Sequence, residues 1–138
     1  MRYSTCGFRR GLWAAPVLLL LAVGGCGRYA PVRGKVTLED GTPVTSGTVI
    51  FESKEADKPL TARGDIQTDG SYQLSTDRPG DGVPPGWYRV LVAPPPQNPD
   101  GPPVKEVFDR RYGAFATSGL EFEVKSGSND YPIRLSKR

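Results

Sequence analysis

The sequence predicts an all-β fold, a single antiparallel β-sandwich of seven strands that follows an N-terminal helical signal peptide. Apolar and polar residues alternate in short stretches from residue 32 onward, which is the pattern of strands with one buried face. Glycine, proline and Asp-Gly pairs separate these stretches about every dozen residues, as turns do in antiparallel sandwiches. Beyond residue 32 no long stretch has the apolar spacing of a helix.

The first expected strand is VRGKVTL, residues 32–38, in which apolar residues and glycine alternate with polar ones. Asp40-Gly41 then marks a turn. The segment GTVIFES, residues 47–53, is the second expected strand, and ARGDIQT, residues 62–68, is a weaker third. Each of these strands is expected to turn one face toward the core.

Asp69-Gly70 is a two-residue hairpin signal and leads into the expected strand SYQLST, residues 71–76. Residues 77–86 are rich in glycine and proline and form a loop. The segment WYRVLVA, residues 87–93, combines β-branched and aromatic residues and predicts the clearest strand of the chain.

Residues 94–103, PPPQNPDGPP, cannot form a central strand because proline has no N–H to donate, so they predict a stiff surface loop. Residues 104–112 space their apolar side chains as a short turn of helix does. The last expected strands are 119–125 and 131–137. Glu121 and Glu123 share the polar face of the first of these, which would discourage pairing at a sheet edge.

Residues 1–25 have the layout of a secretory signal peptide, with a positive start, a twelve-residue apolar run and small residues at the end. A helix of twelve residues reaches about 18 Å, which is short of the roughly 30 Å hydrocarbon core of a membrane. The segment is therefore expected to direct export rather than to span the membrane.

The segment Ala22-Val23-Gly24-Gly25-Cys26 resembles a bacterial lipobox. The resemblance implies that the Cys26 thiol receives diacylglycerol, that cleavage occurs before Cys26, and that acyl chains anchor the protein in a membrane. The expected organisation is a lipoprotein signal peptide (1–25), a lipidated cysteine with a short tether (26–31) and a sandwich domain (32–138). The expected location is the cell envelope, exported and lipid-anchored at the periplasmic or outer-membrane face of a bacterium.

Charge and residue content exclude several classes of function. The chain has 18 Lys and Arg and 15 Asp and Glu residues, and removal of the leader with its three arginines would leave 15 of each. A neutral domain lacks the basic character of nucleic-acid binding, so we expect no nucleic-acid partner. The chain has no histidine, which excludes Ser-His-Asp and Cys-His catalysis. Aspartates in the predicted turns lack EF-hand spacing, so we expect no bound metal. The sequence shows no catalytic constellation, so we also expect no other cofactor and no enzymatic activity.

Three segments carry a family resemblance: VRGKVTLEDGTPVTSGTVIFES, TDGSYQL and PPGWYRVLV. Together they resemble the carboxypeptidase regulatory-like domain, a small sandwich of the transthyretin-like or prealbumin-like group. The tail RRYGAFATSGLEFEVKSGSNDYPIRL is similar to the ending of small lipobox-bearing proteins of planctomycete-type bacteria. The resemblance implies a sandwich fold and a non-catalytic module.

Two interpretations of function stay open. The first is a structural or protein-interaction module of the envelope, whose partner is expected to contact the proline loop and the segment after it. The residues expected to make this contact are Pro95, Pro96, Asn98, Arg110, Arg111 and Tyr112. The alternative is an envelope protein that binds a small ligand or glycan through the loops at one end of the sandwich. Separately, Trp87, Tyr88 and Tyr72 are considered as a stacking platform for a carbohydrate. Strand alternation requires that one of Trp87 and Tyr88 point inward.

Overall fold

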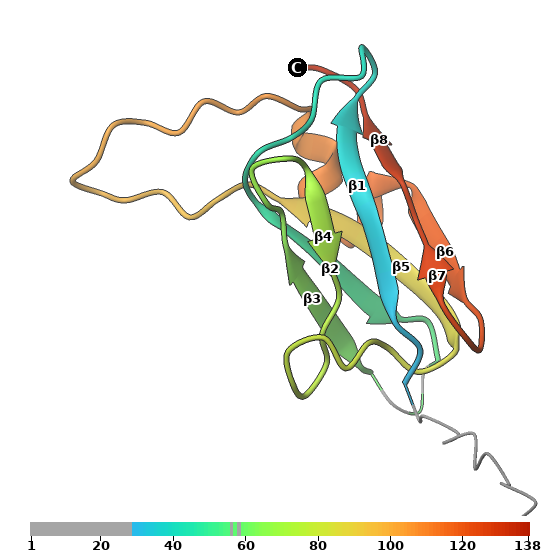
Figure 1. Ribbon diagram of the computed structural model, residues 1–138. Coiled ribbons are helices and arrows are strands. Elements are labelled where there is room, and N and C mark those ends of the chain that lie inside the picture. The colour runs from blue at the N-terminus through green and yellow to red at the C-terminus, as the bar shows by residue number, and fades with distance from the viewer. Residues whose placement is uncertain (1–28, 56, 58) are drawn as a thin grey trace, which may run out of the picture.

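The computed structural model describes residues 29–55, 57 and 59–138, which form two four-stranded sheets packed as a β-sandwich, as the sequence predicts (Figure 1). The strands are β1 (Val32–Leu38), β2 (Thr48–Ser53), β3 (Thr61–Asp65), β4 (Ser71–Gln73), β5 (Gly86–Ala93), β6 (Leu120–Val124), β7 (Asn129–Asp130) and β8 (Ile133–Leu135). Two short helical segments, η1 (Arg110–Gly113) and α1 (Phe115–Ser118), lie between β5 and β6. The predicted signal peptide and Cys26 lie outside the described residues.

The sandwich differs from the expected one in the return of its last segment. One sheet has the order β3-β2-β5-β6 and is antiparallel throughout. In the other sheet β1 pairs with β4 on one side and, in parallel, with β7 and β8 on the other. Strand β6 ends where β1 begins, so the chain that turns there runs back beside β1 in the same direction (Figure 1). Pro132 has no N–H and separates the short strands β7 and β8. Of these, β8 lies within the seventh expected strand (131–137), whereas β7 precedes it.

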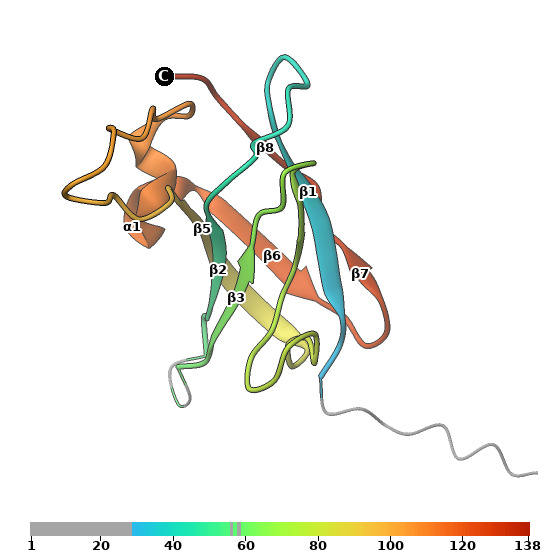
Figure 2. The ribbon, with the colours of Figure 1, turned by 60° about the vertical axis from the view of Figure 1, so that its left-hand side comes forward.

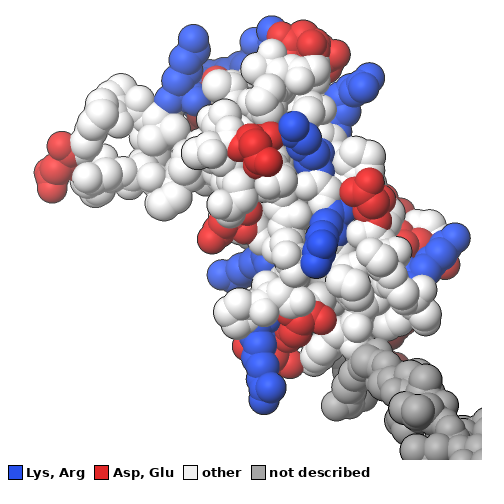
Figure 3. All heavy atoms as spheres, viewed as in Figure 1, with Lys and Arg blue, Asp and Glu red and all other residues white. Residues whose placement is uncertain are grey.

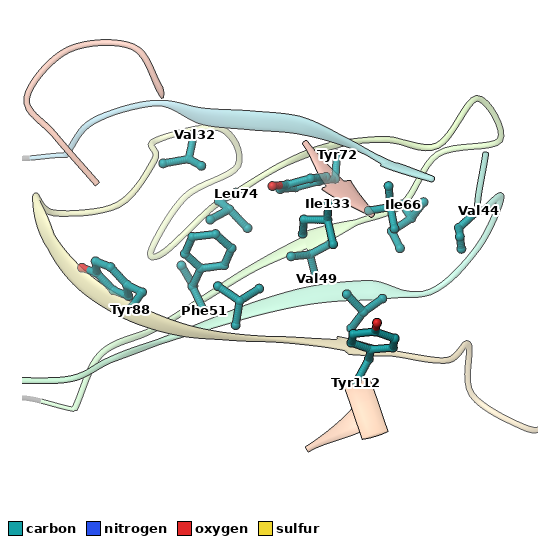
Figure 4. Packing of buried hydrophobic residues seen from close by; sticks show 14 of the residues in the cluster. Val32, Val44, Val49, Phe51, Ile66, Tyr72, Leu74, Tyr88, Tyr112 and Ile133 are labelled. Atoms are coloured by element: carbon teal, nitrogen blue, oxygen red, sulfur yellow. The ribbon is translucent and has the colours of Figure 1, made fainter. Parts of the chain in front are cut away.

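The inner faces of the two sheets form one apolar core, and the period-two pattern identifies these faces correctly. On β1 and β2 the buried residues are Val32, Val36, Leu38, Val49 and Phe51. Figure 4 shows Phe51 between the two layers. Its ring centroid lies 5.9 Å from that of Tyr88 and 6.1 Å from that of Phe122. Burial of such a side chain contributes about 1.5–3 kcal/mol to stability.

The turn at Asp69-Gly70 forms as predicted, but the strands beside it do not make a hairpin. Gly70 has a φ of 85°, and the Asp69 carboxylate accepts the N–H of Ser71 at 2.9 Å. The flanking strands β3 and β4 belong to different sheets and are joined only by an isolated bridge between Arg63 and Ser75. The turn therefore carries the chain from one layer to the other, which the local signal could not indicate.

Both helical segments pack against β5 on the outer side of the antiparallel sheet (Figure 2). Leu91 alternates away from the core on β5 and is nevertheless buried beneath them. The buried Ser118 hydroxyl donates a 2.6 Å hydrogen bond to the Val90 carbonyl, which fixes α1 to the strand.

The helical turn expected over residues 104–112 forms only at the end of that segment, as η1. Residues 104–107 have no regular structure, and Phe108 pairs with Lys137 as extended backbone. Asp109 donates its N–H to the Ser136 carbonyl, and its carboxylate then caps η1 by accepting the N–H of Arg111 at 2.9 Å. Because this pairing holds the backbone extended up to Asp109, the helix begins only at the next residue.

Candidate functional site

The two ends of the sandwich carry different structures. At the entry end, where the described chain begins, Ala30 exchanges two backbone hydrogen bonds with Val83, of 2.7 and 2.9 Å. The opposite end, the loop end, carries the long loop between β5 and η1, both helical segments and the C-terminus (Figure 1). We name residues 94–114 and 136–138, all at the loop end, the proline-loop surface.

Residues 94–107 form a loop without helix or strand that projects from the sandwich, as the prolines predict (Figure 1). Pro96 and Asn98 are exposed and Pro95 is half-buried. Asn98 shapes the tip of the loop. Its side-chain oxygen accepts the N–H of Asp100 at 3.2 Å, and its backbone carbonyl accepts that of Gly101 at 3.1 Å. The three predicted contact residues of the loop thus share one projecting segment.

Tyr112 corrects the predicted contact set, because its side chain is only 4% exposed. Its hydroxyl accepts hydrogen bonds from Arg111 Nη2 (2.6 Å) and from the Ser136 N–H (3.2 Å). Burial raises the pKa of Tyr112, but hydrogen bonds from Ser136 and Arg111 outweigh this effect, and the pKa is lowered. Tyr112 therefore anchors η1 to the sandwich, while Arg110 and Arg111 are exposed.

A pocket of about 260 Å³ lies where the proline loop meets the sandwich. Its lining residues are Pro94, Glu106, Phe108, Arg110, Gly113 and Ala114. Phe108 is buried and supplies an apolar floor, whereas Arg110 and Glu106 are charged. The pocket thus joins an apolar cavity to a charged margin.

Glu106 holds two guanidinium groups at this margin. Its Oε2 atom accepts hydrogen bonds from Arg110 Nε at 2.7 Å and from Arg138 Nη1 at 2.6 Å. The hydrogen bond from Arg110 lowers the pKa of Glu106. These exposed pairs contribute little to stability, but they position the two arginines. The Glu106–Arg110 spacing of four residues is visible in the sequence, whereas the approach of Arg138 depends on the fold.

A second hollow, of about 600 Å³, lies along the side of the sandwich where β3 meets β4 and the loop after it. Its lining is mostly polar and includes Arg63, Gln73 and Arg78. The loop after β4 is braced by Asp81, whose carboxylate accepts three backbone N–H groups at 2.8–3.0 Å, among them that of Arg78. This bracing places Arg78 at the hollow. We name this hollow the polar groove.

The stacking platform considered for a glycan does not form. Tyr72 and Tyr88 lie in the core, where their hydroxyls donate hydrogen bonds to the carbonyls of Tyr131 (2.7 Å) and Pro84 (2.8 Å). Trp87 is half exposed, so the predicted division between it and Tyr88 is confirmed. Trp87 is the one residue of the three that remains available for stacking.

Charges of both signs are interspersed over the face shown in Figure 3. Among the residues that the structure describes, no group of three or more Cys, Asp and Glu side chains is placed to hold a metal ion. In the same residues no helix is long and apolar enough to cross a membrane. Glu121 and Glu123 lie on β6, which is an edge strand, as their proposed role in discouraging edge pairing requires.

No protein-family model and no curated protein matches the chain. Among solved structures, a DUF3823 family protein from Parabacteroides merdae is 13% identical to this chain with a TM-score of 0.45. The match covers 80% of this chain and 47% of the Parabacteroides chain. A 9R-lipoxygenase from Cyanothece is 12% identical with a TM-score of 0.40, and the match covers 79% of this chain and 16% of the lipoxygenase chain. The chain spans less than half the length of either structure, and neither similarity assigns a function to it.

Proposed function

We propose that the protein is a membrane-anchored bacterial lipoprotein whose sandwich is a non-catalytic interaction module of the cell envelope, of the carboxypeptidase regulatory-like type. The lipobox-like sequence before Cys26 supports the anchor, and the motifs in the first half of the chain support the domain type. The observation that carries the proposal is the placement of the proline-loop surface at the end opposite the entry of the chain (Figure 1).

The distance between Cys26 and the sandwich is short. Ala30 is already paired with Val83, and it follows Cys26 by four residues. Four residues of extended chain span at most about 14 Å. A lipid on Cys26 therefore holds the entry end close to the bilayer. Strand β1 alone, at about 3.3 Å per residue, raises the loop end roughly 20 Å further.

This arrangement holds the proline-loop surface at a distance from the membrane, with the loop projecting to the side of the sandwich, where another envelope protein can reach it (Figure 1). The loop is suited to such a contact because proline fixes its backbone, so little conformational entropy is lost on binding. Pro95, Pro96, Asn98, Arg110 and Arg111 are the residues that we assign to the contact. Tyr112 is buried and makes no such contact; its hydroxyl accepts a hydrogen bond from Arg111 and so helps to position that residue.

Lipidation is tested by expressing the full chain and its Cys26→Ser variant in bacteria that process lipoproteins. We expect the wild type to begin at Cys26, to carry acyl mass and to sediment with membranes, because the thiol is the only attachment point that the lipobox-like sequence offers. The variant should keep its leader or be released without acyl mass. Masses that differ only by the replacement of sulfur with oxygen, with no acyl mass on the wild type, would refute the anchor.

The polar groove favours one second candidate, a binding protein for a small polar ligand or glycan. Its volume of about 600 Å³ lies within the roughly 300–1,000 Å³ of small-molecule sites. Arg63, Gln73 and Arg78 supply hydrogen-bonding groups. A thermal-shift screen of neutral oligosaccharides tests it: a stabilising sugar whose effect is lost in Arg78→Ala supports this candidate, and a screen without any shift removes it.

A further inference from the structure

We propose that the pocket at the base of the proline loop receives a single apolar side chain from an acidic segment of a partner protein. This inference rests on the proposed function, since it names the chemistry of the partner that the interaction module would bind. It is argued from the size of the pocket, its lining and the charge around it.

The size of the pocket favours one side chain over a whole ligand. Its 260 Å³ is below the roughly 300–1,000 Å³ of pockets that enclose small molecules. Interfaces between proteins are commonly fixed by one anchor residue that fills such a desolvated pocket. The volume therefore fits the anchor of a protein partner better than a free metabolite.

The lining indicates an apolar anchor. Phe108 forms the buried floor, with Pro94 and Ala114 beside it. Val107, the residue before Phe108, is one of only two large hydrophobic residues exposed in the described chain, at 40%. Val107 does not line the pocket, so the apolar character of the site rests on Phe108, Pro94 and Ala114.

The charge around the pocket indicates an acidic partner. The proline-loop surface carries five basic and three acidic side chains, whereas the rest of residues 26–138 carries 10 basic and 12 acidic ones. One of the five, Lys137, is paired with Asp40 at 2.6 Å, so the charge that faces a partner comes mainly from the arginines. The one carboxylate of Glu106 is shared by Arg110 and Arg138, so it compensates only one of these two charges. Figure 3 shows Lys and Arg side chains at this end of the molecule, with acidic side chains among them.

The same charge disfavours a second copy of the chain, because two such surfaces would bring like charges together. Arg110 and Arg138 are 70% and 56% exposed, so both are available to a partner. Carboxylates on that partner can accept bidentate hydrogen bonds from either guanidinium group. The proposed occupant is thus a polypeptide segment with one apolar residue between aspartates or glutamates.

The test uses the full-length lipidated protein in nanodiscs of neutral lipid and three synthetic peptides. The first peptide has a central leucine flanked by Asp and Glu, the second has alanine in place of the leucine, and the third has Asn and Gln in place of the acids. Fluorescence anisotropy gives the affinity of each. We expect the first peptide to bind about tenfold more tightly than either of the others.

Two variants locate the binding. Ala114→Phe fills the pocket, and its extended backbone (φ −138°, ψ 140°) accepts any side chain. Arg110→Glu reverses a charge at the margin. Each should weaken binding of the first peptide about tenfold. The matched control Lys125→Glu, an exposed residue in the turn at the entry end, should leave it unchanged. Thermal unfolding confirms that each variant folds.

The outcomes separate this inference from the proposed function. If the unlipidated Cys26→Ser chain binds the first peptide as the wild type does, the pocket assignment holds even where the anchor fails. Equal affinity for all three peptides, or binding that neither Ala114→Phe nor Arg110→Glu reduces, would overturn the inference. A concentration-dependent dimer that Ala114→Phe abolishes would overturn it in favour of a second copy.

Discussion

The hydroxyl of Tyr112 ties η1 to the C-terminal residue Ser136, and Tyr112→Phe removes that hydroxyl while keeping the ring. The Ser136 N–H then loses its acceptor at 3.2 Å, and Arg111 loses a 2.6 Å hydrogen bond. A half-buried donor left without a partner costs about 1–3 kcal/mol, whereas the loss at the exposed guanidinium is small. We therefore expect the free energy of unfolding to fall by about 1–2 kcal/mol.

Urea unfolding of the full chain, carrying Cys26→Ser so that no detergent is needed, measures this change. Tyr131→Phe is the matched control, because the Tyr131 hydroxyl donates only a long 3.5 Å hydrogen bond to the carbonyl of Glu121. It should alter stability by less than about 0.5 kcal/mol. If Tyr112→Phe unfolds like the wild type, or if both variants lose the same stability, the hydroxyl does not anchor η1 and the reasoning is refuted.

Three further predictions concern the sandwich. Phe51→Ala should lower the free energy of unfolding by about 3–5 kcal/mol in urea titrations, because the cavity it leaves is fully buried, and a loss under 1 kcal/mol would contradict the packing. Gly64→Ala should reduce the melting temperature, because its Cβ would lie 2.5 Å from the Gln73 carbonyl oxygen. The control Gly113→Ala should not, because its Cβ would meet nothing within 4 Å. Equal melting temperatures for the two variants would refute this contact. Burial raises the pKa of Tyr88 to about 12, with a contribution from Glu55. Between pH 10 and 12 the unfolded chain therefore loses this proton while the folded chain keeps it, and the free energy of unfolding should fall by up to about 1.4 kcal/mol per pH unit, where a flat profile would contradict the burial.

The strands were predictable from the sequence because one buried face is a local property. The alternation in VRGKVTL placed Val32, Val36 and Leu38 inside, and the pair Trp87-Tyr88 divided as strand geometry requires. The turn at Asp69-Gly70 was equally local. These features need only neighbouring residues for their explanation.

The pairing of strands was not predictable, because it depends on residues far apart in the chain. The parallel return of β7 and β8 beside β1 follows from where β6 ends, and the late start of η1 follows from the pairing of Phe108 with Lys137. The apolar spacing of residues 104–112 by itself predicts a turn of helix, but the pairing of Phe108 with Lys137 holds the backbone extended there.

The candidate site could be predicted only in part, because some of its features are local and others depend on contacts between residues far apart in the chain. The proline loop and the exposure of Arg110 and Arg111 follow from composition, whereas the burial of Tyr112 requires the partner Ser136. The sequence does not predict the pocket, because Phe108 and Glu106 are positioned by contacts with the C-terminal residues Lys137 and Arg138. The spacing of Glu106 and Arg110 was the only signal in the sequence that pointed to it.

The central claim, an anchored module that holds its proline-loop surface at a distance from the membrane, is tested most directly by measuring the depth of two labels. Asp100→Cys at the loop end and Ser126→Cys at the entry end are both exposed, and beyond residue 26 the chain has no other cysteine that a fluorophore could label. In vesicles containing spin-labelled headgroups, the lipidated protein should show strong quenching at position 126 and little at position 100. Equal quenching at both positions, or stronger quenching at position 100, would contradict the account.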